Sequence, residues 1–257
     1  MRNTAKPLWP LAGFSVAMMA TGLVWAGFET RLFQDALVWI KPFKFALSFA
    51  VLFATLAWAV DKMSASAQFT RTLRWTVAIL AAAFWVEMIY ITLQAAQGIG
   101  SHYNTADLYH NVMYAIMGVG AVSLVVGTGV IGWAMLRDTG ARVHEDLRFG
   151  VGVGFILSTA LTLVTAGALS SMAGHFVGTP PVGAATIPFF GWSAAVGDLR
   201  PAHFLALHAM QAIPLLAWAV QGRVSARVWI VGGSAGYTAL TLALFAQALM
   251  GLPMVRL

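Results

Sequence analysis

Polar side chains that could do chemistry follow one helix face inside a long apolar stretch. Glu87, Tyr90, Gln94 and Gln97 succeed one another at steps of three, four and three residues, the spacing that keeps side chains on one side of a helix. Glu87 is the only carboxylate well inside any apolar stretch. Because intramembrane ionisable residues are functional candidates, this stripe predicts a proton relay or a ligand site, with Glu87 and Tyr90 as reacting groups. A protonated Glu87 that bonds a neighbouring helix is the structural alternative.

The histidines predict a second kind of chemistry. Five of the six lie at the same ends of the apolar stretches: His102, His110, His175, His203 and His208. Imidazole binds haem iron, copper, iron and zinc. We therefore expect a site in which some of His102, His110, His203 and His208 bind one haem b group or one copper, iron or zinc ion. The alternatives are a His203 at the headgroup level and a His208 that bonds across helices.

Basic and amide groups near the same ends predict an anion-binding rim. Lys41, Lys44 and Arg200 could bind haem propionates or an anionic small molecule, although lysines at helix ends also reach the lipid headgroups. Gln94 belongs to the Glu87 stripe, and Gln211 lies one turn beyond His208 and could orient it. We expect these five residues to bind the cofactor or ligand.

The composition of the chain indicates the environment in which these candidate residues lie. The chain has 257 residues, of which 60% are hydrophobic and only 9% are charged, against about 25% charged residues in soluble domains. Such a chain is solvated mainly by lipid. The absence of cysteine excludes disulfides, thiolate metal sites and iron–sulfur clusters. The net charge of +6 comes without any dense Lys/Arg run, so the partner is a lipid bilayer and not a nucleic acid.

The apolar stretches predict an all-α membrane protein with seven transmembrane helices in one bundle. A span needs about 20 apolar residues, and such runs lie at 8–28, 43–60, 75–98, 112–136, 149–171, 202–220 and 228–250. We expect an uncleaved first helix, one polytopic domain over 1–257, a structured non-cytoplasmic cap loop at 172–201 and a short interfacial helix at 29–41. Pro42 suits a first helical turn, and Pro214 predicts a kink.

Loop charges predict the orientation. Ten Lys/Arg residues fall on the side of the N-terminus and five on the other side. The positive-inside rule then places the N-terminus in the cytoplasm and the C-terminus outside, in a multi-pass protein of a bacterial inner membrane.

Known seven-helix families do not fit these residues. Retinal proteins need a lysine in the last helix, and the only lysines are Lys6, Lys41, Lys44 and Lys62. Seven-span zinc hydrolases carry two histidines four residues apart on a late helix, whereas His203 and His208 are five apart. Transmembrane cytochromes with two haems need histidines on both membrane sides, whereas the histidines of this chain that lie near its apolar stretches are on one side.

Two main hypotheses remain. In the first, the chain is a membrane oxidoreductase, or an assembly factor for one, with haem or a metal ion at the histidines and possible contact to a quinone. In the second, it is a metal-free carrier or sensor whose pocket is lined by the Glu87 stripe and gated by the cap. An enzyme acting on lipid and a structural subunit are further alternatives.

Overall fold

A computed structural model of the chain describes residues 4–33, 36–172 and 174–256. These residues form seven helices that are long and apolar enough to cross a membrane. The protein is therefore an all-α, multi-pass membrane protein, as predicted. The chain divides into an N-terminal unit, residues 1–142, and a C-terminal unit, residues 143–257, and each is described by itself. The expectation of a single membrane domain stays a prediction.

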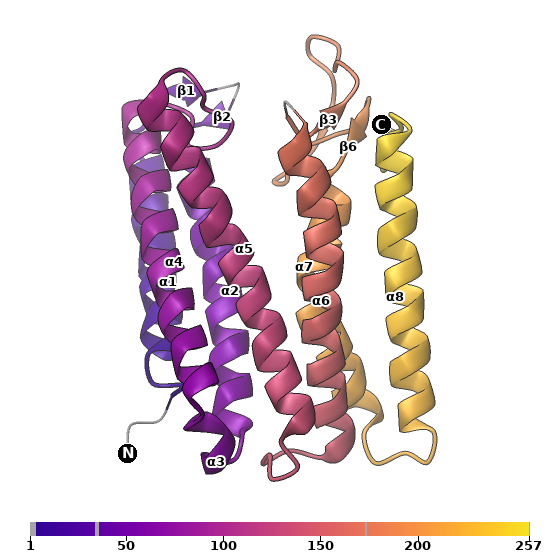
Figure 1. Cartoon of the computed structure of the whole chain (residues 1–257). Helices are drawn as coiled ribbons and strands as arrows, with labels where there is room; N and C mark the ends of the chain where they lie inside the picture. The colour runs from indigo at the N-terminus through magenta and orange to yellow at the C-terminus, as the bar shows by residue number, and fades with distance from the viewer. Residues whose placement is uncertain (1–3, 34–35, 173, 257) are drawn as a thin grey trace. The chain divides into compact units, whose positions relative to one another are not determined.

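The N-terminal unit contains four long helices that run side by side (Figure 1). They are α1 (Leu8–Ala26), α2 (Ile40–Lys62), α4 (Arg71–Gln97) and α5 (Leu108–Arg137), and a short helix α3 (Ala65–Gln68) precedes α4. α1 packs mainly on α2, and α4 packs on α5 and also contacts α2. Pro42 lies in the first turn of α2, as the sequence predicted.

The segment before α2 corrects one expectation. In place of an interfacial helix at 29–41, β1 (Leu32–Phe33) pairs antiparallel with β2 (Ala36–Leu37). The pairing continues where Val38 N donates to Arg31 O at 3.1 Å. Arg31 also binds Glu29 and donates to Ala96 O at the end of α4, and these bonds favour a turn over a helix. We call this end of the unit the hairpin end.

Capping residues fix where α4 and α5 begin and end. The Thr70 hydroxyl accepts a hydrogen bond from Leu73 N at the start of α4, and Asp107 does the same for His110 N at the start of α5. Gly98, with φ of +70°, ends α4 in the left-handed conformation that glycine adopts without a steric penalty. The loop 98–107 therefore returns the chain at the hairpin end.

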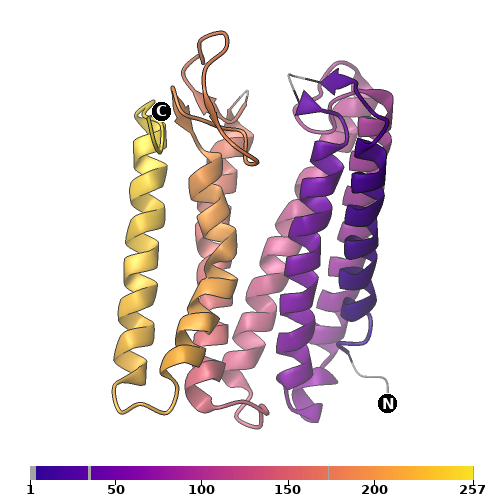
Figure 2. The same ribbon diagram turned by 180° about the vertical axis from the view of Figure 1, so that it is seen from behind.

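The C-terminal unit contains α6 (Glu145–Ser171), α7 (Arg200–Val220) and α8 (Ala226–Leu249) (Figure 2). Glycines bring α6 and α7 close together: a Cβ on Gly150 would lie 2.2 Å from Ala217 Cβ, and one on Gly154 would lie 2.8 Å from Pro214 Cδ. Small residues allow this close approach of membrane helices. Pro214 lies inside α7, and the kink expected there stays a prediction.

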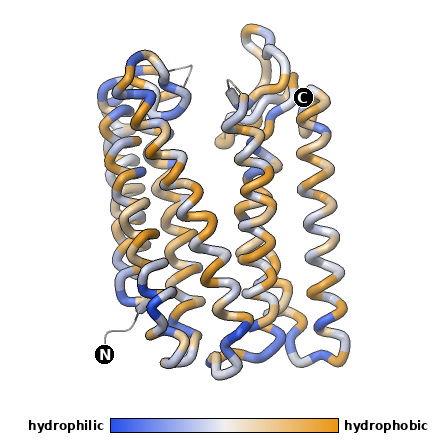
Figure 3. Tube along the Cα trace, viewed as in Figure 1, coloured by the Kyte–Doolittle hydropathy of each residue, from blue (hydrophilic) through white to orange (hydrophobic). Residues whose placement is uncertain are grey.

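The predicted cap is built from four short strands between α6 and α7. β3 (Phe176–Val177) pairs with β6 (Gly197–Asp198), and β4 (Thr186–Ile187) pairs with β5 (Trp192–Ser193). In both units hydrophilic residues gather at the helix ends and loops, and apolar residues cover most of the helix lengths (Figure 3). This distribution matches a bilayer environment.

Candidate functional site

The predicted stripe on α4 is buried inside the N-terminal unit. Glu87, Tyr90 and Gln94 are each at most 4% exposed. They span about 10 Å of the helix axis, since seven residues rise 1.5 Å each. Glu87 Oε1, Tyr90 OH and Gln94 Oε1 have no hydrogen-bond partner among the residues that the structure describes. A buried polar atom without a partner costs free energy, so this face is suited to a ligand that supplies the missing bonds.

Small and apolar residues form the wall opposite the stripe. Gly120 of α5 lies against Glu87, and a Cβ built on this glycine would be 2.9 Å from Glu87 Oε1. Met117, one turn earlier on α5, packs with Tyr90, and Phe45 of α2 packs against the same cluster. The stripe therefore faces the interior between α2, α4 and α5.

Lys41 adds a positive charge to this interior. It lies in the first turn of α2 at the hairpin end and is half-buried. Its ammonium group is close enough to interact electrostatically with the Glu87 carboxylate and with the His102 ring. The structure thus brings together the predicted residues Lys41, Glu87 and His102. Lys44 lies one turn further along α2 and is also half-buried.

His102 is held by the loop between α4 and α5. Its Nδ1 lies 3.1 Å from the Ser101 hydroxyl, and its ring contacts Phe45 and Tyr114 at centroid distances of 5.6 and 6.4 Å. Burial, with a further contribution from the Lys41 charge, lowers the pKa of His102 to about 3. The ring is therefore neutral near pH 7 and can accept or donate a hydrogen bond.

The same loop carries local strain. Tyr103 has a φ of +55°, a conformation that costs free energy for a residue with a Cβ. Its ring packs on Tyr114 at 5.6 Å, and the Asn104 side chain donates to Gly100 O at 3.0 Å. These contacts hold the backbone in the turn that directs His102 inward.

His110 has a capping role that the sequence analysis did not assign. Asp107 accepts a hydrogen bond from His110 N at 2.9 Å, and His110 Nδ1 lies 2.8 Å from Asp107 Oδ2. The backbone bond first, and then the ring bond, lower the pKa of Asp107. The Asp-x-x-His spacing at the start of an apolar run was a signal for this cap.

The two remaining predicted ligands lie on α7 in the C-terminal unit. His208 Nδ1 is 2.7 Å from Phe204 O, and the His208 ring stacks on Phe204 at 3.9 Å. A carbonyl oxygen only accepts, so Nδ1 is the donor of this bond. Gln211 is half-buried on the next turn.

His203 has a hydrogen-bonding partner on α6. Its Nδ1 lies 3.0 Å from the Thr165 hydroxyl, which itself donates to Leu161 O at 3.0 Å. The contact with Thr165 orients the His203 ring between α6 and α7.

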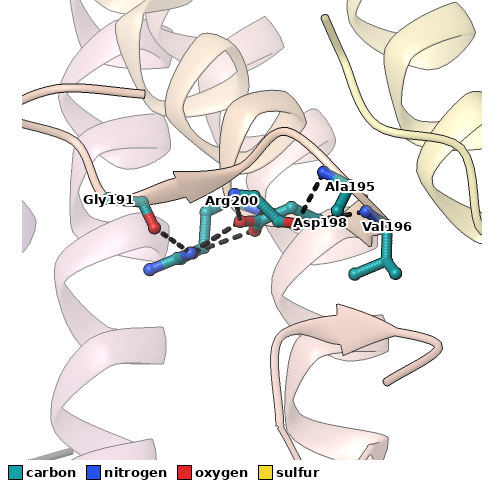
Figure 4. Close-up of polar contacts among 6 residues, drawn as sticks. Gly191, Ala195, Val196, Asp198 and Arg200 are labelled. Atoms are coloured by element: carbon teal, nitrogen blue, oxygen red, sulfur yellow. Dashed lines mark hydrogen bonds and ion pairs between the residues drawn. The ribbon is translucent and has the colours of Figure 1, made fainter. Parts of the chain in front are cut away.

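Arg200 has a partner within the cap. Its guanidinium group binds Asp198 through Nε and Nη2 at 2.9 and 2.6 Å, and Nη2 also donates to Gly191 O at 2.7 Å (Figure 4). Asp198 also accepts from Ser193 N, and the Ser193 hydroxyl accepts from the N–H groups of Ala195 and Val196. Arg200 therefore ties β6 to the residue that precedes β5.

The four predicted histidine ligands are divided between the units, with His102 and His110 in one and His203 and His208 in the other. Within the described ranges, no three His, Asp or Glu side chains are grouped so that they could hold a metal ion. The structure brings together the Glu87 stripe, Lys41 and His102, and it gives His110, His203, His208 and Arg200 separate local partners.

A groove on the outside of the N-terminal unit borders the same stripe. It has a volume of about 340 Å³ and is mostly apolar, lined by Trp85, Val86, Ile89, Tyr90, Leu93, Tyr109 and Met113. The groove and the Gly120 wall were both missed from the sequence. Their residues look like ordinary packing residues until the pairing of α4 with α5 is known.

No family model, no curated protein and no solved structure matches this chain.

Proposed function

We propose that the N-terminal unit binds a small polar molecule between α2, α4 and α5, and that the protein is a membrane carrier or sensor for it. The observation that carries this proposal is the buried stripe of Glu87, Tyr90 and Gln94, whose polar atoms lack partners in the described part of the chain. Stability alone disfavours three such atoms in one place. A ligand that fills their hydrogen bonds accounts for them.

The charges around the stripe indicate the chemistry of the ligand. Lys41 lies at the hairpin end, so it is suited to attract a carboxylate or phosphate group. Glu87, Tyr90 and Gln94 lie deeper along α4 and offer hydrogen-bonding oxygens. The expected ligand carries one anionic group for Lys41 and hydroxyl or amino groups for the stripe.

A thermal-shift experiment tests this proposal. The purified protein in neutral detergent is titrated with acetate, lactate, succinate and inorganic phosphate, and its melting temperature is measured. At least one of these anions should raise the melting temperature of the wild type and of Lys62→Gln, which changes a lysine at the other end of α2. Lys41→Gln should lose the increase. If no anion acts through Lys41, the proposal fails.

A bound haem or metal ion is the second candidate. It is supported by the hydrogen bonds at Nδ1 of His203 and His208, because such bonds orient an imidazole so that Nε2 can bind a metal. This reading makes the protein an oxidoreductase or an assembly factor. An absorption spectrum with a Soret band, or iron, copper or zinc by elemental analysis, would support it. Unchanged metal content in His203→Ala and His208→Ala would reject these ligands.

We also place the protein in a bacterial inner membrane with its N-terminus in the cytoplasm, on the basis of the loop charges. The absence of native cysteine makes single-cysteine labelling straightforward. Thr179→Cys in the cap should react with a membrane-impermeant maleimide in intact cells. Thr139→Cys, in the loop after α5, should react only after permeabilisation. The reverse pattern would invert the orientation.

A further inference from the structure

A basic groove lies at the other end of the N-terminal unit, where α4 begins. Arg71, Arg74, Trp75 and Ala78 line this open groove, which has a volume of about 570 Å³. These positions are separated by three, one and three residues, so they share one face of the first two turns of α4. The groove is far from the Glu87 stripe: sixteen residues separate Arg71 from Glu87, about 24 Å along the helix.

The charge of this groove has one sign. Both arginines are exposed, and the lining residues that the structure describes include no carboxylate. The amino-terminal end of α4 adds the positive end of the helix dipole. Two guanidinium groups one turn apart are suited to bind a phosphate group with several hydrogen bonds.

The residues that follow along the same face suit an apolar chain. Trp75 is 64% exposed, as expected for an indole at the level of the lipid headgroups and glycerol. Below it Ala78 and Ala82 are exposed and small, and Trp85 follows one turn later. These small side chains leave space along the helix surface between the indole rings of Trp75 and Trp85. A ligand that fits has an anionic head and a long apolar tail.

We infer that this groove is a binding site for an anionic phospholipid. The lipid phosphate lies between Arg71 and Arg74, the glycerol backbone lies beside Trp75, and an acyl chain follows Ala78 and Ala82. Basic clusters and pockets at the ends of membrane helices bind the head groups of anionic lipids. The inference is independent of the ligand proposed for the α2, α4 and α5 interior.

Native mass spectrometry of the full chain tests this site. The delipidated protein in neutral detergent is titrated with a dioleoyl phosphatidylglycerol probe and, separately, with the matching phosphatidylcholine. For the wild type, the first phosphatidylglycerol should bind tighter than phosphatidylcholine by at least an order of magnitude. The Arg71→Gln/Arg74→Gln variant should lose this preference, and inorganic phosphate should not displace the lipid.

A matched variant separates a built site from general surface charge. Arg137→Gln/Arg223→Gln also removes two exposed arginines, at the ends of α5 and α7, and should keep the preference. Equal binding of the two lipids by the wild type, or an equal loss in both double variants, would overturn the inference. Displacement by inorganic phosphate would mean a site for a free anion, which also overturns it. Melting temperatures of both variants establish that they are folded.

Discussion

The Glu87 carboxylate lies directly against the backbone of Gly120: a Cβ at residue 120 would be 2.9 Å from Glu87 Oε1. Gly120 therefore makes the room in which the carboxylate lies. Because Glu87 Oε1 is the far end of a flexible side chain, Gly120→Ala should shift the carboxylate and leave the helices in place. We expect anion-dependent stabilisation to fall by at least half, while the melting temperature without ligand changes by only a few degrees.

Gly118 provides the control for this prediction. It lies two residues earlier on α5, and a Cβ there would meet nothing within 4 Å. Gly118→Ala should therefore leave both the melting temperature and the response to anions unchanged. Equal behaviour of the two alanine variants would show that the contact between Gly120 and Glu87 does not position the carboxylate for binding.

Removing the hydroxyl of Tyr90 or of Tyr237 tests whether each one stabilises the fold. It has no hydrogen-bond partner in the described ranges, whereas the Tyr237 hydroxyl donates to Leu205 O at 2.7 Å. Tyr90→Phe should therefore leave the free energy of unfolding unchanged or raise it by up to about 1 kcal/mol. Tyr237→Phe should lower it by about 1 kcal/mol. Reversible unfolding in mixed micelles measures both, and a clear loss of stability in Tyr90→Phe would assign its hydroxyl a structural bond.

His102 predicts how stability depends on pH. Burial lowers its pKa from 6.5 in the unfolded chain to about 3 in the folded protein, so between these values the unfolded state binds more protons. Stability should fall as the pH falls through this window and be complete above about pH 6.5. His102→Gln should have a flatter profile of melting temperature between pH 6.5 and 5.

Glu29 sets the lower limit of the useful range. Its hydrogen bonds with Arg31 lower the pKa of this carboxyl to about 2 from 4.5, so its contribution is lost only below about pH 4.5. Measurements above pH 5 therefore report on His102 separately from Glu29. Parallel profiles for the wild type and His102→Gln would indicate that the folded protein lets this ring take up a proton.

The sequence predicted the seven helices because each apolar run is long enough to span a bilayer, and that signal needs no tertiary contact. It failed at 29–41, where the bonds of Arg31 to Glu29 and to Ala96 O stabilise a hairpin. The helical spacing of apolar residues there was a weaker determinant than these bonds.

The candidate site was only partly predictable for a related reason. The steps from Glu87 to Tyr90 and Gln94 place these residues on one helix face, so the stripe could be predicted from residue spacing alone. The partners Lys41 and Gly120 come from other helices, and periodicity does not say which helices pack together. A local helix cap also accounts for one predicted ligand, because the His110 ring binds the capping residue Asp107 at the start of α5.

The ion pair of Asp198 with Arg200 holds segments of the cap together, and this contact gives the last prediction. The Asp198 side chain is 1% exposed, and its oxygens accept from the Arg200 guanidinium and from Ser193 N. Asp198→Asn removes the charge from a buried pair, which should lower the free energy of unfolding by on the order of 3 kcal/mol. It should also release the strands of the cap. Chymotrypsin should then cleave several times faster after Phe189, which is already 60% exposed.

The control for this cleavage is Asp107→Asn, which changes an exposed carboxylate at the start of α5 and should leave the cleavage rate unchanged. Because the amide oxygen of the asparagine could still accept the bond from Ser193 N, the cleavage rate reports the loss of the ion pair itself. An unchanged rate in Asp198→Asn would mean that the strand pairing alone holds the cap in place.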